Sequence, residues 1–294
     1  MGDARADAIA TVLVCGAGLM GHGIAQVCAA AGRHVFLYEP DRARTEAGVA
    51  RIAGNLERAV EKGRLEAEER TATLGRIEVA DSLLAAAAQA DLVIEAVYED
   101  EQVKTALFDE LDSRANETAV FATNTSSISI TRLAAAVSPD RRPLFAGMHF
   151  FSPVPVMPLV ELVRGIETSD ETEAVIRAFA AALGKEVISA KDRPGFVVNR
   201  VLMPLLAEAM KAYEEGVSSA EEIDQGVRLG LRHPMGPLEL ADFIGLDVCL
   251  HVMDVLHEGF GDPRFAVPPV LRQLVDAGHL GQKTGRGFYT YPRD

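Results

Sequence analysis

The sequence predicts an α/β protein, with a doubly wound, mostly parallel sheet domain over residues 1–193 and a smaller all-helical domain over 194–294. Two observations carry this prediction. Up to residue 193, short apolar runs typical of buried strands alternate with helical segments, the order that produces a parallel sheet covered by helices. Beyond that point, apolar residues recur at helical spacing and strand signals are few. The length of 294 residues agrees with two domains.

The sheet domain is expected to begin with a strand, a glycine turn and a helix. Residues 11–15 are an apolar run typical of a buried strand, residues 24–30 have helical character, and residues 34–38 predict a second strand. The charged, alanine-rich residues 42–75 predict two helices that break near Gly63. The alternation then continues with strands at 76–79, 91–97, 119–123 and 144–151 and helices at 83–90, 103–114 and 130–137.

The alternation of expected strands and helices is interrupted after residue 151. A loop with three prolines between residues 153 and 158 is followed almost at once by the extended residues 159–163. So short a connection cannot cross over to a parallel neighbour, so the strands at 144–151 and 159–163 are expected to run antiparallel. The domain is completed by a helix at 170–183, a strand at 186–189 and a boundary turn at 192–195.

The second domain is expected to consist of helices. One is predicted from about residue 197 to 215, and Ser218–Glu222 resembles a capping box before the next. A further helical stretch spans 238–257 with small breaks, and the last helix starts at 269–277.

Residues 16–21 form the pattern GAGLMG directly after the first expected strand. Gly16 permits a tight turn, Gly18 lets the backbone approach a pyrophosphate, and Gly21 allows helix and strand to pack closely. The N-terminus of the following helix offers N–H donors and partial positive charge to that phosphate. These features predict a dinucleotide-binding site of the Rossmann type.

Glu39 ends the second strand, where this fingerprint requires a carboxylate for the adenosine ribose hydroxyls. Because a carboxylate repels the 2′-phosphate that distinguishes NADP, the predicted cofactor is NAD. Arg42 and Arg44 follow closely and could serve a phosphate, which leaves NADP as the alternative.

Composition excludes several classes of partner. The formal net charge of −14 argues against nucleic acid and against anionic membrane surfaces. No apolar stretch approaches the length of a membrane span, and residues 1–10 are not expected to be a signal peptide. Cys15, Cys28 and Cys249 are scattered and flanked by apolar residues, which is typical of reduced core thiols in the cytoplasm, and none has the spacing of metal ligands.

Polar residues follow three of the expected parallel strands. Glu99 comes after the strand at 91–97, Asn124–Ser127 after the next, and His149 lies near the end of the strand at 144–151. Ligands of doubly wound sheets bind beyond the carboxyl ends of the strands, so these groups are expected to converge beside the glycine loop. Histidine has the pKa that suits a base taking a hydroxyl proton while hydride leaves for a nicotinamide.

Glu161 is the expected partner of His149. It lies on the adjacent strand of the predicted hairpin, where it could accept from the second ring nitrogen and stabilise the imidazolium. The alternative is an exposed strand carboxylate, but its apolar neighbours make an unpartnered charge there costly. Ser126 and Ser127 could instead cap the helix that follows them.

Segments along nearly the whole chain match one family in order: GAGLMG at 16–21, DLVIEA at 91–96, NTSS at 124–127, GMHFF at 147–151, PVPVM at 153–157 with Glu161, PGFVVNR at 194–200, HPMGP at 233–237 and KTGRGFY at 283–289. In these segments the chain resembles the short-chain L-3-hydroxyacyl-CoA dehydrogenases, which include the bacterial 3-hydroxybutyryl-CoA dehydrogenases. The resemblance implies reversible, NAD-linked oxidation of an L-3-hydroxyacyl-CoA to the 3-ketoacyl-CoA. Acyl chain length and pathway stay open.

The resemblance also implies roles for individual residues. His149 would be the catalytic base and Glu161 its partner, while Ser126 and Asn199 would bind the reacting oxygens of the substrate. The family further implies a homodimer built largely through the helical domain. The implied cofactor-binding residues are Gly16, Gly18, Leu19, Met20, Gly21, Glu39, Glu99, Lys104, Ser126, Ser152 and Lys283, and the implied substrate-binding residues are Asn55, Lys62 and Ser126.

Two departures from the family pattern stand out. Ser152 occupies a position that is usually Asn, and its shorter side chain is expected to weaken one cofactor contact. Pro158 replaces a residue that is often Lys, so a charge contact is lost there. Two other functions stay open: oxidation of a sugar acid such as L-gulonate on the same fold, and a non-catalytic NAD-binding structural protein.

Overall fold

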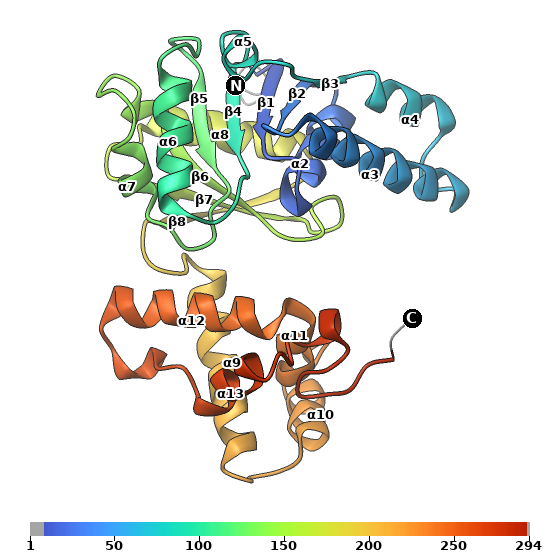
Figure 1. Ribbon diagram of the computed structural model, residues 1–294, viewed down its shortest axis with the longest axis vertical. Helices are drawn as coiled ribbons and strands as arrows, with labels where there is room; N and C mark the ends of the chain where they lie inside the picture. Colours follow the sequence, from blue (N-terminus) through green and yellow to red (C-terminus); the bar gives the residue numbers. More distant parts are fainter. Residues whose placement is uncertain (1–8, 293–294) are drawn as a thin grey trace. The chain divides into compact units, whose positions relative to one another are not determined.

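The structure is a computed structural model that describes residues 9–292. The chain divides into two compact units, Met1–Asp192 and Arg193–Asp294, each of which is described below by itself (Figure 1). Most of the segment that was not expected to be a signal peptide lies outside the described residues. No helix within residues 9–292 combines the length and the apolar character needed to cross a bilayer.

The N-terminal unit is built on one sheet. Its strands are β1 (Thr11–Cys15), β2 (His34–Tyr38), β3 (Ile77–Val79), β4 (Leu92–Glu95), β5 (Val120–Thr123), β6 (Phe145–Phe150), β7 (Leu159–Arg164) and β8 (Glu186–Lys191). Within the described residues the strand order is β3-β2-β1-β4-β5-β6-β7-β8. Strands β1 to β6 pair in parallel, whereas β7 is antiparallel to β6 and parallel to β8. The predicted mostly parallel sheet and the predicted antiparallel pair are confirmed.

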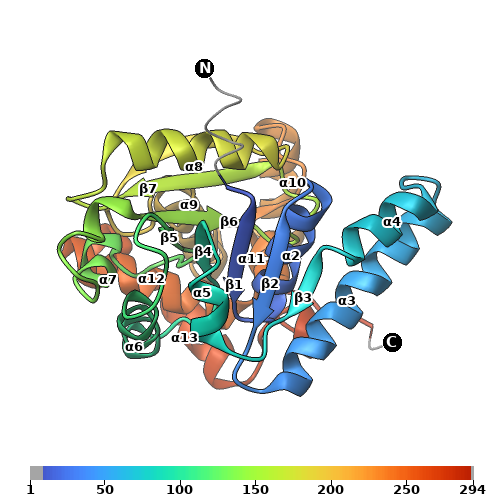
Figure 2. The same cartoon turned by 90° about the horizontal axis from the view of Figure 1, so that it is seen from above.

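Helices cover both faces of this sheet (Figure 2). They are α2 (Leu19–Ala30), α3 (Arg42–Glu61), α4 (Ala67–Leu74), α5 (Leu83–Ala87), α6 (Glu101–Asp112), α7 (Ile130–Ala134) and α8 (Asp170–Ala182), with a 3₁₀ turn, η1 (Arg142–Leu144). Helices α2 and α8 share one apolar core with alternate strand residues such as Val12, Val14 and Met148. On the other face, the ring of Phe108 from α6 packs against those of Phe121 and Phe145. The alternation places neighbouring strand residues on opposite faces.

The C-terminal unit is helical, as predicted. Its helices are α9 (Val198–Glu214), α10 (Ala220–Gly230), α11 (Pro237–Ile244), α12 (Leu246–Phe260) and α13 (Pro269–Asp276), with 3₁₀ turns η2 (Pro263–Phe265) and η3 (Gln282–Thr284). A separate apolar core joins them, centred on residues such as Leu206, Leu238 and Cys249. The expected break within 238–257 falls at Gly245, whose φ of 104° suits a residue without a side chain. Ser219 caps α10 by accepting from the backbone N–H of Glu222.

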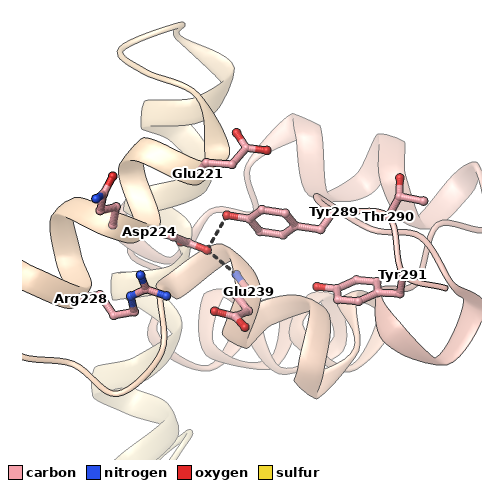
Figure 3. Close-up of a pocket in the computed structure, with 8 residues that line it drawn as sticks. Glu221, Asp224, Arg228, Glu239, Tyr289, Thr290 and Tyr291 are labelled. Atoms are coloured by element: carbon pink, nitrogen blue, oxygen red, sulfur yellow. Dashed lines mark hydrogen bonds between the residues drawn. The ribbon is translucent and has the colours of Figure 1, made fainter.

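Two buried aspartates hold the end of the chain in place. Asp242 accepts hydrogen bonds from the backbone N–H groups of Phe288 and Tyr289 and from the hydroxyl of Tyr291. Asp224 accepts from the hydroxyl of Tyr289 and, through the backbone N–H groups of Leu238 and Glu239, from the first turn of α11. A hollow of about 510 Å³, lined in part by Asp224 and Tyr289, lies beside the contacts of Asp224 (Figure 3).

Candidate active site

The glycine turn is shaped by the strand beside it. Gly16 follows β1 with a φ of 106°, and its N–H donates to the carbonyl of Tyr38 at the end of β2. A Cβ atom at Gly16 would lie 2.4 Å from the carbonyl oxygen of Ala96, and one at Gly21 would lie 1.8 Å from that of Gly16. These two glycines are therefore required by backbone conformation and by close packing, as the fingerprint predicts.

Gly18 differs from both. A Cβ atom at this position would meet nothing within 4 Å, so packing within the protein does not explain the glycine. Gly18 is the N-cap of α2, which begins at Leu19 rather than near residue 24 as expected. The open space beside a helix N-terminus fits a pyrophosphate, which needs close access to backbone N–H groups. Leu19 is largely exposed next to it, and Met20 is half-buried.

Glu39 lies where a ribose-binding carboxylate is expected. One of its oxygens, Oε2, accepts from the N–H of Ala17 at 3.1 Å, which holds it against the glycine turn. Nη1 of Arg44 lies 3.5 Å from Oε1 of Glu39, and Arg42 forms ion pairs with Glu46 and Asp81. Both arginines thus face carboxylates, which favours NAD over NADP at this site.

His149 and Glu161 meet in the register of the sheet. Antiparallel pairing sets them directly opposite each other on β6 and β7, so both side chains stand on the same face. Nδ1 of His149 lies 2.7 Å from Oε2 of Glu161, with side-chain exposures of 5% and 0%. A carboxylate can only accept, so ionised Glu161 selects the tautomer with hydrogen on Nδ1. The other nitrogen, Nε2, then accepts from the hydroxyl of Ser126 at 3.0 Å.

The ends of three strands converge as expected. Glu99 follows β4, and its Oε1 atom accepts from the backbone N–H of Ser126 in the loop after β5. In the same loop, Oδ1 of Asn124 accepts from the N–H of Phe150, the residue that follows His149 on β6. Hydrogen bonds therefore link the three polar groups that the sequence places at successive strand ends.

Lys104 occupies an unexpected place. Expected among the cofactor-binding residues, it has no exposed side-chain surface, and its Nζ atom lies 2.5 Å from Oε1 of Glu95 and 3.1 Å from Oε2 of Glu99. Any influence of Lys104 on a cofactor must therefore pass through Glu99. Lys104 shares a helical face with Phe108 and Leu111, both buried, and this spacing was the sequence signal that could have revealed its burial.

The remaining site residues are spread over both units. Asn55 lines a hollow of about 480 Å³ together with His22, Arg51 and Arg58. In the N-terminal unit, Lys62 is exposed at the end of α3 and Ser152 is exposed after β6. In the C-terminal unit, Asn199 is half-buried in the first turn of α9 and Lys283 forms an ion pair with Asp247. The described residues include no cluster of three or more side chains suited to a metal ion.

Comparison with known proteins identifies the family. The family model for the NAD binding domain of 3-hydroxyacyl-CoA dehydrogenase matches residues 11–193, and the model for the C-terminal domain matches residues 195–291. The chain belongs to the 3-hydroxyacyl-CoA dehydrogenase family. As a 3-hydroxyacyl-CoA dehydrogenase it is an NAD-dependent oxidoreductase, in agreement with the glycine turn and Glu39.

Named relatives match nearly the whole length of the chain. A 3-hydroxybutyryl-CoA dehydrogenase from Bradyrhizobium diazoefficiens is 50% identical over 286 residues, which is 97% of each chain. The mitochondrial hydroxyacyl-coenzyme A dehydrogenase of Sus scrofa is 43% identical over 95% of this chain and 90% of its own length. The crystal structure of (S)-3-hydroxybutyryl-CoA dehydrogenase from Ralstonia eutropha superposes with a TM-score of 0.94 at 47% identity, over 97% of this chain and 100% of the other.

Proposed function

We propose that the chain oxidises short-chain L-3-hydroxyacyl-CoA thioesters reversibly to 3-ketoacyl-CoA, with His149 as the general base. The observation that carries this proposal is the position of His149 between Glu161 and Ser126, at 2.7 Å and 3.0 Å. The names of the relatives support (S)-3-hydroxybutyryl-CoA as the substrate, because those relatives are 50% and 47% identical over 97% of this chain.

The buried pair supplies the acid–base step. His149 takes the hydroxyl proton of the substrate on Nε2, while Nδ1–H donates to Glu161 and the carboxylate stabilises the imidazolium. Because Glu161 has no exposed surface, water does not weaken this interaction. When bound, NAD supplies the acceptor for the hydride that leaves the carbon bearing the hydroxyl. Ser126 and Asn199 bind the reacting oxygens and orient the substrate.

Other residues hold the cofactor and the coenzyme A part of the substrate. Glu39 binds the adenosine ribose, Glu99 serves the nicotinamide side, and Lys283 is assigned a contact with the cofactor. Asn55 and Lys62 contact coenzyme A, and the basic side chains near Asn55 oppose the negative charge of the whole chain. The proposed cofactor-binding set is Gly16, Gly18, Leu19, Met20, Gly21, Glu39, Glu99, Ser126, Ser152 and Lys283, without the fully buried Lys104.

The assembly and the location of the enzyme are also proposals. Large apolar side chains stay exposed on the C-terminal unit, including Val201, Leu229 and Leu231, which supports a homodimer through that unit. A sedimentation mass of a single chain would contradict it.

Buried free thiols such as Cys28, whose pKa burial raises to about 12, support a cytoplasmic location. Recovery of the chain from another cell fraction would contradict that proposal.

Replacement of the base tests the proposal directly. With acetoacetyl-CoA and NADH, we expect His149→Gln to lower kcat by about 10³-fold or more, because only the positioned imidazole exchanges the proton. NADH binding, followed by fluorescence, should stay unchanged. His34→Gln is the matched control, since His34 is half-exposed on β2. Full activity of His149→Gln, or faster turnover of L-gulonate than of the acyl-CoA, would overturn the proposal.

A further inference from the structure

Glu99 is the anchor of the loop that carries Ser126. Its Oε1 atom accepts four hydrogen bonds: from Thr125 Oγ1 at 2.6 Å, from the N–H groups of Ser126 and Ser127 at 2.8 and 3.1 Å, and from Ser127 Oγ at 3.0 Å. A single carboxylate oxygen thus fixes three consecutive residues of the loop after β5. The hydroxyl of the middle residue is the one that reaches His149.

Lys104 fixes Glu99 in turn. Its ammonium group lies between Glu99 and Glu95 without any contact with solvent. Glu95 is also fully buried, and it accepts from the hydroxyl of Thr123 at 2.6 Å and from the N–H of Val97 at 2.7 Å. The cluster of Glu95, Lys104 and Glu99 therefore connects the ends of β4 and β5 with α6 by charge-assisted hydrogen bonds, which are shorter and stronger than neutral ones.

The pKa values of the two carboxylates in this cluster are shifted in opposite directions. Burial raises the pKa of Glu95, and the opposing effects of Lys104, Thr123 and Val97 do not offset it. Burial also acts to raise the pKa of Glu99, but Lys104 and the loop donors outweigh it and hold the pKa below its ordinary value. The surroundings of Glu99, which include the donors of the loop, thus favour its charged form.

We propose that Glu99 and Lys104 are positioning residues, which hold Ser126 at the distance from His149 that the reaction needs. This inference rests on the proposed function, because the two residues act on turnover through Ser126 and His149, to which that function assigns the reaction. The ammonium group orients Glu99, Glu99 orients the loop, and the loop presents the hydroxyl to Nε2.

A double-mutant cycle tests this chain of contacts. Glu99→Gln places an amide NH₂ against either the loop donors or the ammonium group, so we expect kcat to fall roughly ten-fold or more. KM for acetoacetyl-CoA and the Kd of NADH should change far less. Because Glu99 acts through Ser126, the double variant Glu99→Gln/Ser126→Ala should be no slower than Ser126→Ala alone.

Matched variants complete the experiment. Glu101→Gln, on the same helix and paired only with Arg132 among the described residues, should keep wild-type kinetics. Lys104→Met should reproduce the loss seen in Glu99→Gln; if it fails to fold, the cycle with Ser126 still decides. The inference would be overturned if the two single losses in kcat multiplied in the double variant, or if Ser126→Ala kept wild-type activity. It would also be overturned if the Kd of NADH rose by as large a factor as kcat fell. An inactive His149→Gln beside such a result would leave the proposed function intact.

Discussion

Glu161 in the N-terminal unit and Asp242 in the C-terminal unit are both buried carboxylates, but their partners differ. Glu161 faces the ring of His149, a group that can gain and lose a proton. Asp242 faces the backbone N–H groups of Phe288 and Tyr289, which cannot. Equal burial therefore accompanies a proposed catalytic role in one unit and a structural role in the other. The partner of a buried carboxylate, rather than its burial, indicates which role it has.

The largest expected effect is the loss of turnover when Glu161 is replaced. In Glu161→Gln the amide can donate to Nδ1 and favour the tautomer that carries hydrogen on Nε2, so the imidazole no longer accepts the substrate proton. We expect kcat to fall by about 10³- to 10⁴-fold, as for the loss of a tautomer-setting carboxylate elsewhere. Stopped-flow and steady-state assays with acetoacetyl-CoA and NADH measure this. The control Glu167→Gln alters an exposed carboxylate beyond β7. If Glu161→Gln kept the wild-type kcat, Glu161 and Asp242 would not differ in role in the way proposed.

Asp242→Asn should show the opposite pattern. An asparagine has one acceptor oxygen for two backbone donors and adds an NH₂ group that has no place among them, so we expect a loss of about 1–3 kcal/mol in the free energy of unfolding. Turnover per folded molecule should stay near wild type. Thermal unfolding followed by circular dichroism checks the first part, and active-site titration the second. Asp254→Asn, at an exposed ion pair with Arg272, is the control. Unchanged thermal stability would mean that the C-terminal segment needs no anchor.

The smallest expected effect is a pH dependence. Burial raises the pKa of Asp242 above its ordinary value, in spite of the hydrogen bonds from Tyr289, Phe288 and Tyr291. Its contribution to stability is therefore fully present below the unfolded pKa, ~3.9, and is lost as pH rises through the folded value. We expect the difference in melting temperature between wild type and Asp242→Asn to be largest near pH 4 and to shrink toward pH 7. A constant difference over this range would contradict the assignment.

Much of the proposed site followed from local sequence features. The short connection after residue 151 predicted the antiparallel pair, and the apolar neighbours of Glu161 predicted its burial; the structure confirms both. The glycine pattern predicted the turn after β1, because the conformation and space around Gly16 and Gly21 depend on neighbours close in sequence or in the adjacent strand. These features depend on rules that act over a few residues.

Other features depend on distant partners. The anchor Asp242 lies 46 residues before Phe288, in a helix whose pattern gives no reason to expect a bond to the chain end. The order of the strands in the sheet could not be predicted either, because alternation of strands and helices is compatible with several orders. The start of α2 before residue 24 was not predicted, because Gly21 and Gly23 lower helix propensity. Packing explains Gly23, since a Cβ atom there would lie only 2.9 Å from the side chain of Val154.

The reversal of direction at β7 has a consequence for how this sequence can vary. Opposed residues in an antiparallel ladder share a face, so the pairing of β6 with β7 sets His149 and Glu161 side by side. A single residue added inside β7, before Glu161, would turn the carboxylate to the opposite face of the sheet. Evolution and engineering therefore have almost no freedom to change the number of residues in this part of the strand.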